Sequence, residues 1–209
     1  MIKVFFLIFE PGVAWEKIAQ ARRGFVFITA VQLLPLILLG SALETWGLLR
    51  HGKWQPKFQI FKHFPPQEIY TFEIIQFLLL FAVVFVSALL VFKIGLTFQD
   101  RLKFLQAFTT IAYGFCPMFL LRFLDASASM NPLVPWLLGV ALMVWILYQG
   151  IPRVMQPDPT HAFGVYLSAT IVVVLTSGLA RFITGMYLLG DIDFHHSWLS
   201  NRITHLFGQ

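Results

Sequence analysis

Five long apolar stretches divide the chain at nearly regular intervals, and its polar residues gather between them. Each stretch has 18 to 21 residues and contains no Asp, Glu, Lys or Arg. A helix rises about 1.5 Å per residue, so roughly 20 residues cross a hydrocarbon core of about 30 Å. The pattern therefore predicts five transmembrane helices, at residues 25–43, 74–92, 104–121, 132–152 and 162–180.

Composition supports a membrane solvent for this chain. Of its 209 residues, 58% are hydrophobic and only 12% are charged, which is too few polar groups to cover a water-soluble surface. We therefore predict an all-α fold, a polytopic integral membrane bundle of five helices with short amphipathic helices at the interface. The expected organisation is an interfacial segment at 1–24, a membrane domain at 25–190 and a polar tail at 191–209.

The residues before the first span predict a surface helix. If the chain is helical from Pro11 onward, its apolar residues fall on one face and its charged residues fall elsewhere. The apolar face consists of Ala14, Trp15, Ile18 and Ala19. The alternative is a solvated N-terminal arm. Residues 1–9 are too short an apolar run and lack a small-residue cleavage site, so we predict no cleaved signal peptide.

The longest connection, residues 44–73, mixes aromatic and basic side chains. Trp54, Phe58 and Phe61 follow i, i+4, i+7 spacing, which predicts a second interfacial helix ended by Pro65 and Pro66. Its candidate contacts with lipid headgroups or with a partner are Trp54, Lys57, Phe58 and Lys62.

The chain has a net charge of +5, and its basic residues lie between the predicted spans. There they orient the protein in the membrane and contact anionic headgroups, so we expect no nucleic-acid partner. With the N-terminus inside, the inner loops hold eight basic residues: Lys3, Lys17, Arg22, Arg23, Lys93, Arg101, Lys103 and Arg153. The outer side then holds seven: Arg50, Lys53, Lys57, Lys62, Arg122, Arg181 and Arg202. Charge alone leaves the orientation undecided.

No Asp or Glu falls within the five predicted spans, which argues against a proton relay or a coupling-ion site. Polar residues within the spans, among them Gln32, Gln106 and Tyr113, are expected to bond neighbouring helices. Arg181 directly follows the fifth span, and we favour a helix end or a snorkelling side chain over an ion pair inside the bundle. Whether residues 182–189 extend that helix stays open.

Two prolines and two small-residue pairs predict how the helices pack. Pro35 and Pro117 each remove a backbone donor, and Pro117 leaves the carbonyl of Tyr113 without its helical partner, so we expect kinks there. We favour an architectural role for them over a ligand or gating role. Small residues four apart predict close helix contacts; the pairs are Thr110 with Gly114 and Gly164 with Ser168.

Candidate chemistry is sparse. The weak candidate for a metal site is the tail cluster of Asp191, Asp193, His195 and His196, which has suitable ligand atoms but adjacent histidines that rarely share one metal. No nucleophile motif or phosphate-binding loop is present, and we predict no cofactor and no catalytic residue. The single cysteine, Cys116, is expected to be a buried apolar residue.

Several short motifs resemble the Yip-type membrane domain family, named for proteins that interact with Ypt/Rab GTPases. Ahead of the first span, Pro11, Trp15 and Ile18 are similar to the family's Pro-x-x-x-Trp-x-x-Ile element. Further matches are the stretch 93–95 followed by 104–108, then Tyr113 with Pro117, and the stretch 145–151 followed by Ala162.

The resemblance implies five spans, a cytosolic N-terminus and an adaptor or membrane-organising role without catalysis. Only about two dozen residues precede the first span, so the chain looks like the short bacterial members, and GTPase binding is not carried over.

These observations favour a non-enzymatic scaffold or accessory subunit of a membrane assembly, in a bacterial inner membrane. Its expected partners are the lipid bilayer and either another membrane protein or further copies of itself. One alternative is a transporter or channel component whose polar path near Pro35 and Pro117 is lined by Gln32, Gln106 and Tyr113. The other is an interfacial metal-dependent enzyme that uses the tail cluster.

Overall fold

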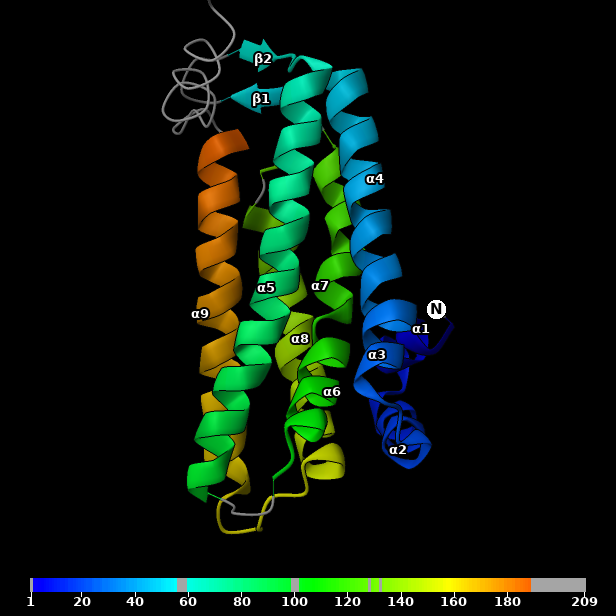
Figure 1. Ribbon diagram of the computed structural model, residues 1–209. Helices are drawn as coiled ribbons and strands as arrows, with labels where there is room; N and C mark the ends of the chain where they lie inside the picture. The colour runs from blue at the N-terminus through cyan, green and yellow to red at the C-terminus, as the bar shows by residue number, and fades with distance from the viewer. Residues whose placement is uncertain (1, 56–59, 99–101, 128, 132, 189–209) are drawn as a thin grey trace, which may run out of the picture.

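The structure is a computed structural model, and it describes residues 2–55, 60–98, 102–127, 129–131 and 133–188. Five helical segments in this part are long and apolar enough to cross a membrane: Phe25–His51, Pro66–Phe98, Phe104–Ala126, Leu133–Val154 and Ala162–Tyr187. They run side by side as an upright bundle (Figure 1). The prediction of an all-α, five-span membrane protein is confirmed.

Two of the five segments are built from consecutive helical pieces. The first consists of α3 (Phe25–Phe27), the π-helix η1 (Ile28–Leu33) and α4 (Leu34–His51). The third consists of α6 (Phe104–Gly114), α7 (Cys116–Leu121) and the 3₁₀-helix η2 (Arg122–Ala126). The others are single helices: α5 (Pro66–Phe98), α8 (Leu133–Val154) and α9 (Ala162–Leu188).

Both interruptions lie next to a proline. Pro35 has no backbone N–H, and its ring would crowd the carbonyl four residues earlier; the wider π-turn of η1 directly precedes it, with the Leu34 N–H bonded to the Thr29 carbonyl. In the third segment the α-helix is broken at Phe115, between α6 and α7, and Pro117 occupies the first turn of α7. A proline is tolerated in a first turn because its missing donor is not needed there.

Short elements cover the two ends of the bundle. Helix α2 (Pro11–Ala21) lies toward one end, here called the α2 end, where α5 and α8 end and α6 and α9 begin, while α1 (Ile2–Phe9) lies beside the bundle nearer its middle (Figure 1). Ala14, Trp15 and Ile18 of α2 are buried while Glu16, Lys17 and Gln20 are exposed, as the amphipathic pattern predicts.

The other end, here called the hairpin end, carries an antiparallel pair of strands, β1 (Lys53–Gln55) and β2 (Ile60–Lys62). The second interfacial helix predicted here is therefore wrong. Gly52 ends α4 with φ +66°, and Trp54 pairs across the strands with Phe61, their rings 4.9 Å apart. The i, i+7 spacing of these two aromatics is satisfied by a cross-strand pair instead of a helix face. Lys57 and Phe58 lie outside the described residues.

The third segment forms the centre of the bundle. Its most apolar window is 72% buried, whereas the other four are 22–39% buried and expose apolar side chains to the surroundings. Helix α6 packs on α5 and α8, α7 packs on α8, and η2 packs on α4. Helix α9 packs mainly on α5. The buried core thus surrounds the chain from Phe104 to Ala126, where the polar groups described next also lie.

Candidate functional site

Three carboxylate side chains are buried at the hairpin end of the bundle. Glu44 of α4, Asp125 of η2 and Glu73 of α5 expose 0%, 2% and 6% of their surface. All three lie within helices long and apolar enough to span the membrane. The expectation of an interior without carboxylates is therefore wrong, because the helices continue past the apolar stretches into residues that the sequence pattern assigns to loops.

Arg122 of η2 contacts two of these carboxylates, one on α4 and one on α5. Its Nη2 donates to Glu44 Oε2 at 2.6 Å, and its Nη1 donates to the hydroxyl of Ser41 at 3.3 Å. Gln76 Nε2 of α5 donates to the same Glu44 oxygen at 2.8 Å. Glu73 is further away, with its Oε2 3.5 Å from Arg122 Nη2. These contacts join α4, α5 and η2, and the charge of Arg122 compensates that of Glu44.

A second ion pair joins η2 to α9. Arg181 Nη2 donates to Asp125 Oδ1 at 2.5 Å, and both side chains are less than a tenth exposed. Helix α9 runs through Arg181 to Leu188, so residues 182–188 extend the fifth span. The favoured interpretation of Arg181 as a snorkelling or helix-end residue is wrong, because the carboxylate of Asp125 offers it a partner inside the bundle.

Lys53 of β1 fastens the hairpin to the same region. Its side chain is 1% exposed, and Nζ donates to the backbone carbonyls of Asp125 and Ser127, each at 3.0 Å. Burial lowers the pKa of Lys53 from its ordinary 10.5, although nearby Asp125 and Glu44 act in the opposite direction. The amine caps the carbonyls at the end of η2, where a cation is electrostatically favoured.

We call these six residues the charged cluster: Glu44, Lys53, Glu73, Arg122, Asp125 and Arg181. Three acidic and three basic groups make its formal charge zero. Because removing either partner of a buried pair leaves the other uncompensated, the cluster holds four helical segments and the hairpin together.

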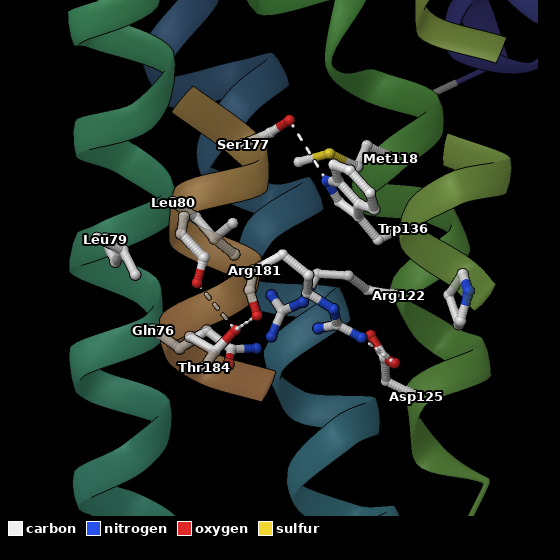
Figure 2. Close-up of a pocket in the computed structure, with 12 residues that line it drawn as sticks. Gln76, Leu79, Leu80, Met118, Arg122, Asp125, Trp136, Ser177, Arg181 and Thr184 are labelled. Carbon is white, nitrogen blue, oxygen red and sulfur yellow. Dashed lines mark hydrogen bonds and ion pairs between the residues drawn. The ribbon is translucent and has the colours of Figure 1, made fainter. Parts of the chain in front are cut away.

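A small cavity lies beside the charged cluster, between α5, α7, η2, α8 and α9. Its volume is about 30 Å³, enough for roughly one or two water molecules. Figure 2 shows Gln76, Arg122, Asp125 and Arg181 converging on it, while Leu80, Met118 and Trp136 supply apolar walls. Among the described residues, Gln76 Oε1, Asp125 Oδ2 and Arg122 Nε have no hydrogen-bond partner. The cavity suits water, and it is too small for an organic substrate.

At the α2 end, residues of the sequence motifs meet in a second contact. The indole of Trp15 donates to the carbonyl of Ile146 at 3.0 Å and meets the ring of Tyr113 edge-to-face, with centroids 6.2 Å apart. A Cβ on Gly150 would lie 2.4 Å from the indole, so only glycine fits beneath it. Tyr113 also accepts a hydrogen bond from Arg23 at 3.3 Å. Together these contacts dock α2 on α8.

The three side chains proposed to line a polar path are engaged in contacts between helices. Gln32 donates to Cys116 Sγ at 3.4 Å, and Gln106 Nε2 donates to the Val154 carbonyl at 3.1 Å. Tyr113 is fully buried in the α2 contact. The cavity beside the charged cluster is lined by other residues, so these contacts do not support a path near Pro35 and Pro117.

The two glycines predicted to mediate helix packing face side chains of neighbouring helices, and the space at Gly114 is smaller than the space at Gly164. A Cβ on Gly114 would come within 2.7 Å of Leu147 of α8, whereas one on Gly164 would lie 3.3 Å from Phe98. The hydroxyls of Thr110 and Ser168 bond carbonyls of their own helices, those of Gln106 and Val165.

The tail cluster of Asp191, Asp193, His195 and His196 lies outside the described residues. Within the described part, no three His, Cys, Asp or Glu side chains are placed to hold a metal. Cys116 is buried, with its thiol against Gln32 and the Ala112 carbonyl.

A sequence signal for the charged cluster exists, although the span pattern alone misses it. Glu44 follows the first apolar stretch, Glu73 precedes the second, Arg122 and Asp125 follow the third, and Arg181 follows the fifth. In an antiparallel bundle all four positions fall at the same end. Opposite charges adjoining four span ends on one side therefore predict ion pairs there.

Comparison with known proteins identifies a family. A family model described as the Yip1 domain matches residues 5–181, which is most of the chain. The match includes the α2 contact and the charged cluster. Searches of the curated proteins and of the solved structures found no match.

Proposed function

Because the chain belongs to the Yip1 domain family, we propose that this integral, multi-pass membrane protein is a non-enzymatic scaffold or accessory subunit of a membrane assembly. The family is not known for catalysis, and five apolar helices bring the protein into contact with the bilayer. The host membrane that we propose is the bacterial inner membrane, on the family resemblance.

The observation that carries the proposal is how the buried polar groups of the bundle are used. Arg122 bonds Glu44, Arg181 bonds Asp125, and Lys53 bonds backbone carbonyls, so these charges connect the protein's own elements. The adjacent cavity is of water size. Such an interior fixes the shape of the bundle, which favours a role exerted through its surfaces.

The hairpin is the surface that we propose for the partner or for lipid headgroups. Ile60 and Phe61 are each 52% exposed at this end of the bundle, and the ammonium of Lys62 lies 4.9 Å from the centre of the Phe64 ring. The strands hold these side chains on a support that Lys53 ties to η2. Exposed aromatic and basic groups on a rigid element suit a membrane surface or a partner's interfacial segment.

The test is gentle extraction of the tagged protein from its native membrane, followed by mass spectrometry of what remains bound. We expect a stoichiometric membrane partner with the natural chain. The double variant Ile60→Ser/Phe61→Ser should lose at least about 90% of it. Tyr70→Ser is the matched control, because Tyr70 is 54% exposed near the same end but lies on α5. Repeated recovery of this chain alone would refute the accessory-subunit proposal.

We further propose that the α2 end faces the cytosol. Three of the seven basic residues counted on the opposite side, Lys53, Arg122 and Arg181, are buried and bonded at the hairpin end. They do not act as free loop charges, so among the described residues only Arg50 and Lys62 remain there as loop charges, against seven basic residues at the α2 end. The positive-inside rule then favours a cytosolic α2 end.

Single-cysteine labelling tests this orientation. Cys116 is the only cysteine, so a Cys116→Ser background carries a thiol only where one is introduced. Gln20 of α2 and His51 at the end of α4 are both exposed and lie at opposite ends. A membrane-impermeant maleimide added to intact cells should label His51→Cys and spare Gln20→Cys until lysis. The reverse pattern would overturn the orientation.

A further inference from the structure

The charged cluster contains more buried hydrogen-bond acceptors than donors. Among the described residues, five oxygens in this region lack a donor: Glu44 Oε1, both carboxylate oxygens of Glu73, Gln76 Oε1 and Asp125 Oδ2. One donor there, Arg122 Nε, lacks an acceptor. Buried polar groups are nearly always bonded, so this imbalance calls for additional donors at the site. Water in the adjacent cavity can donate to Gln76 and Asp125, which line it, but Glu73 is not among the lining residues.

Glu73 is the member of the charged cluster with the least compensation. Neither of its oxygens accepts a hydrogen bond of normal geometry within the described part of the chain, and the nearby donors are the hydroxyl of Ser41 and the guanidinium of Arg122. Within the described residues its ion pair is with Arg122 Nη2 at 3.5 Å, and the same nitrogen is bonded to Glu44 at 2.6 Å. The two carboxylate oxygens that share this nitrogen are therefore at most about 6 Å apart. Two anions this close in a buried site repel each other strongly.

We propose that Glu73 is a proton-binding site of the membrane-embedded bundle. A proton on Glu73 supplies a missing donor and removes the surplus negative charge beside Arg122. Glu44 with Arg122 and Asp125 with Arg181 then form two one-to-one ion pairs.

The surroundings of Glu73 include charged groups from every element that meets at this end. They are Glu44 on α4, Arg122 and Asp125 on η2, Arg181 on α9 and Lys53 on β1. Each arginine has a closer carboxylate than Glu73, and Lys53 is bonded to backbone carbonyls. When the proton leaves, Glu73 competes with Glu44 for Arg122, and the bond between α4 and η2 weakens.

This inference goes beyond a scaffold role and does not depend on it. It makes the hairpin end of the bundle responsive to proton concentration, whichever partner the surface binds.

Infrared difference spectroscopy of the full chain in lipid nanodiscs tests the site directly. The natural protein at neutral pH should show the C=O stretch of a protonated carboxylic acid. That band should disappear in Glu73→Gln and persist in Glu68→Gln, a partly exposed carboxylate on the same helix. It should also disappear at neutral pH in Glu44→Gln, because Arg122 is then free to pair with an ionised Glu73.

A neutral-pH spectrum without a protonated carboxyl would overturn the proposal, as would a band that survives in Glu73→Gln. Thermal unfolding gives a second measurement. A carboxyl in an unfolded chain is ionised above about pH 4.3, so a proton held only by the folded protein makes stability fall as pH rises above that value. Glu73→Gln should fold and lack this part of the slope. An unchanged slope in that variant would also contradict the proposal.

Discussion

Removing Arg181 is the sharpest test of the charged cluster as the element that holds the bundle together. Arg181→Met keeps most of the side-chain length and apolar stem but leaves Asp125 without its 2.5 Å partner. Asp125 is 2% exposed, so little water can replace the guanidinium. Breaking a buried pair by removing one partner costs about 3–5 kcal/mol, and we expect a loss of this size in the free energy of unfolding.

The double variant Asp125→Leu/Arg181→Met separates the pair from simple loss of packing. Because it removes both charges, no ion is left unpaired, and its stability should return to within about 1 kcal/mol of the natural protein. Arg50→Met, an exposed arginine at the same end, is the control and should change stability by no more than about 0.5 kcal/mol.

The measurement is equilibrium unfolding in mixed micelles with a rising fraction of denaturing detergent, followed by tryptophan fluorescence. If Arg181→Met unfolds with the natural protein, or if the double variant is as unstable as the single one, the ion pair does not hold α9 to η2.

Three further predictions concern the other contacts. Gly150→Ala should displace the Trp15 ring that a Cβ would meet at 2.4 Å, costing about 1–3 kcal/mol and shifting the tryptophan emission, whereas Gly24→Ala, with nothing within 4 Å, should be neutral. Lys53→Met should destabilise the hairpin by about 1–3 kcal/mol in hydrogen-exchange protection. Because burial lowers the pKa of Lys53, the folded protein binds fewer protons than the unfolded chain just below pH 10.5, so stability should rise with pH there in the natural protein and not in Lys53→Met. Cys116, 1% exposed, should react with maleimide only on unfolding, and a fast reaction in the folded protein would contradict its burial.

The span pattern predicts the fold well because the bilayer imposes a length on each apolar stretch. All five predicted spans lie within the five helical segments, except that Pro132 falls outside the described residues. The apolar face of α2 follows from its period, and the irregular turns lie beside Pro35 and Pro117, the two positions where a backbone donor is missing.

The pattern of apolar stretches does not predict the charged cluster, and the reason is physical. Hydropathy scores each residue separately, so the charges of Glu44 and Arg122 each mark the end of an apolar stretch. When the two side chains form an ion pair, however, both can be buried. Long-range pairing decides their environment, and that depends on which span ends meet. The hairpin is missed for a similar reason, since Trp54 and Phe61 at i and i+7 satisfy a helical face and a cross-strand pair equally well.

The placement of the charges along the chain has a consequence for biogenesis. Glu44 is synthesised 78 residues before its partner Arg122, and Asp125 is synthesised 56 residues before its partner Arg181. During synthesis the first two spans therefore reach the insertion machinery carrying carboxylates whose counter-charges have not yet been translated. Releasing each helix singly into lipid would strand those ions. The spans must instead remain near the insertion site until their partners arrive, so this small protein enters the membrane as a group of helices.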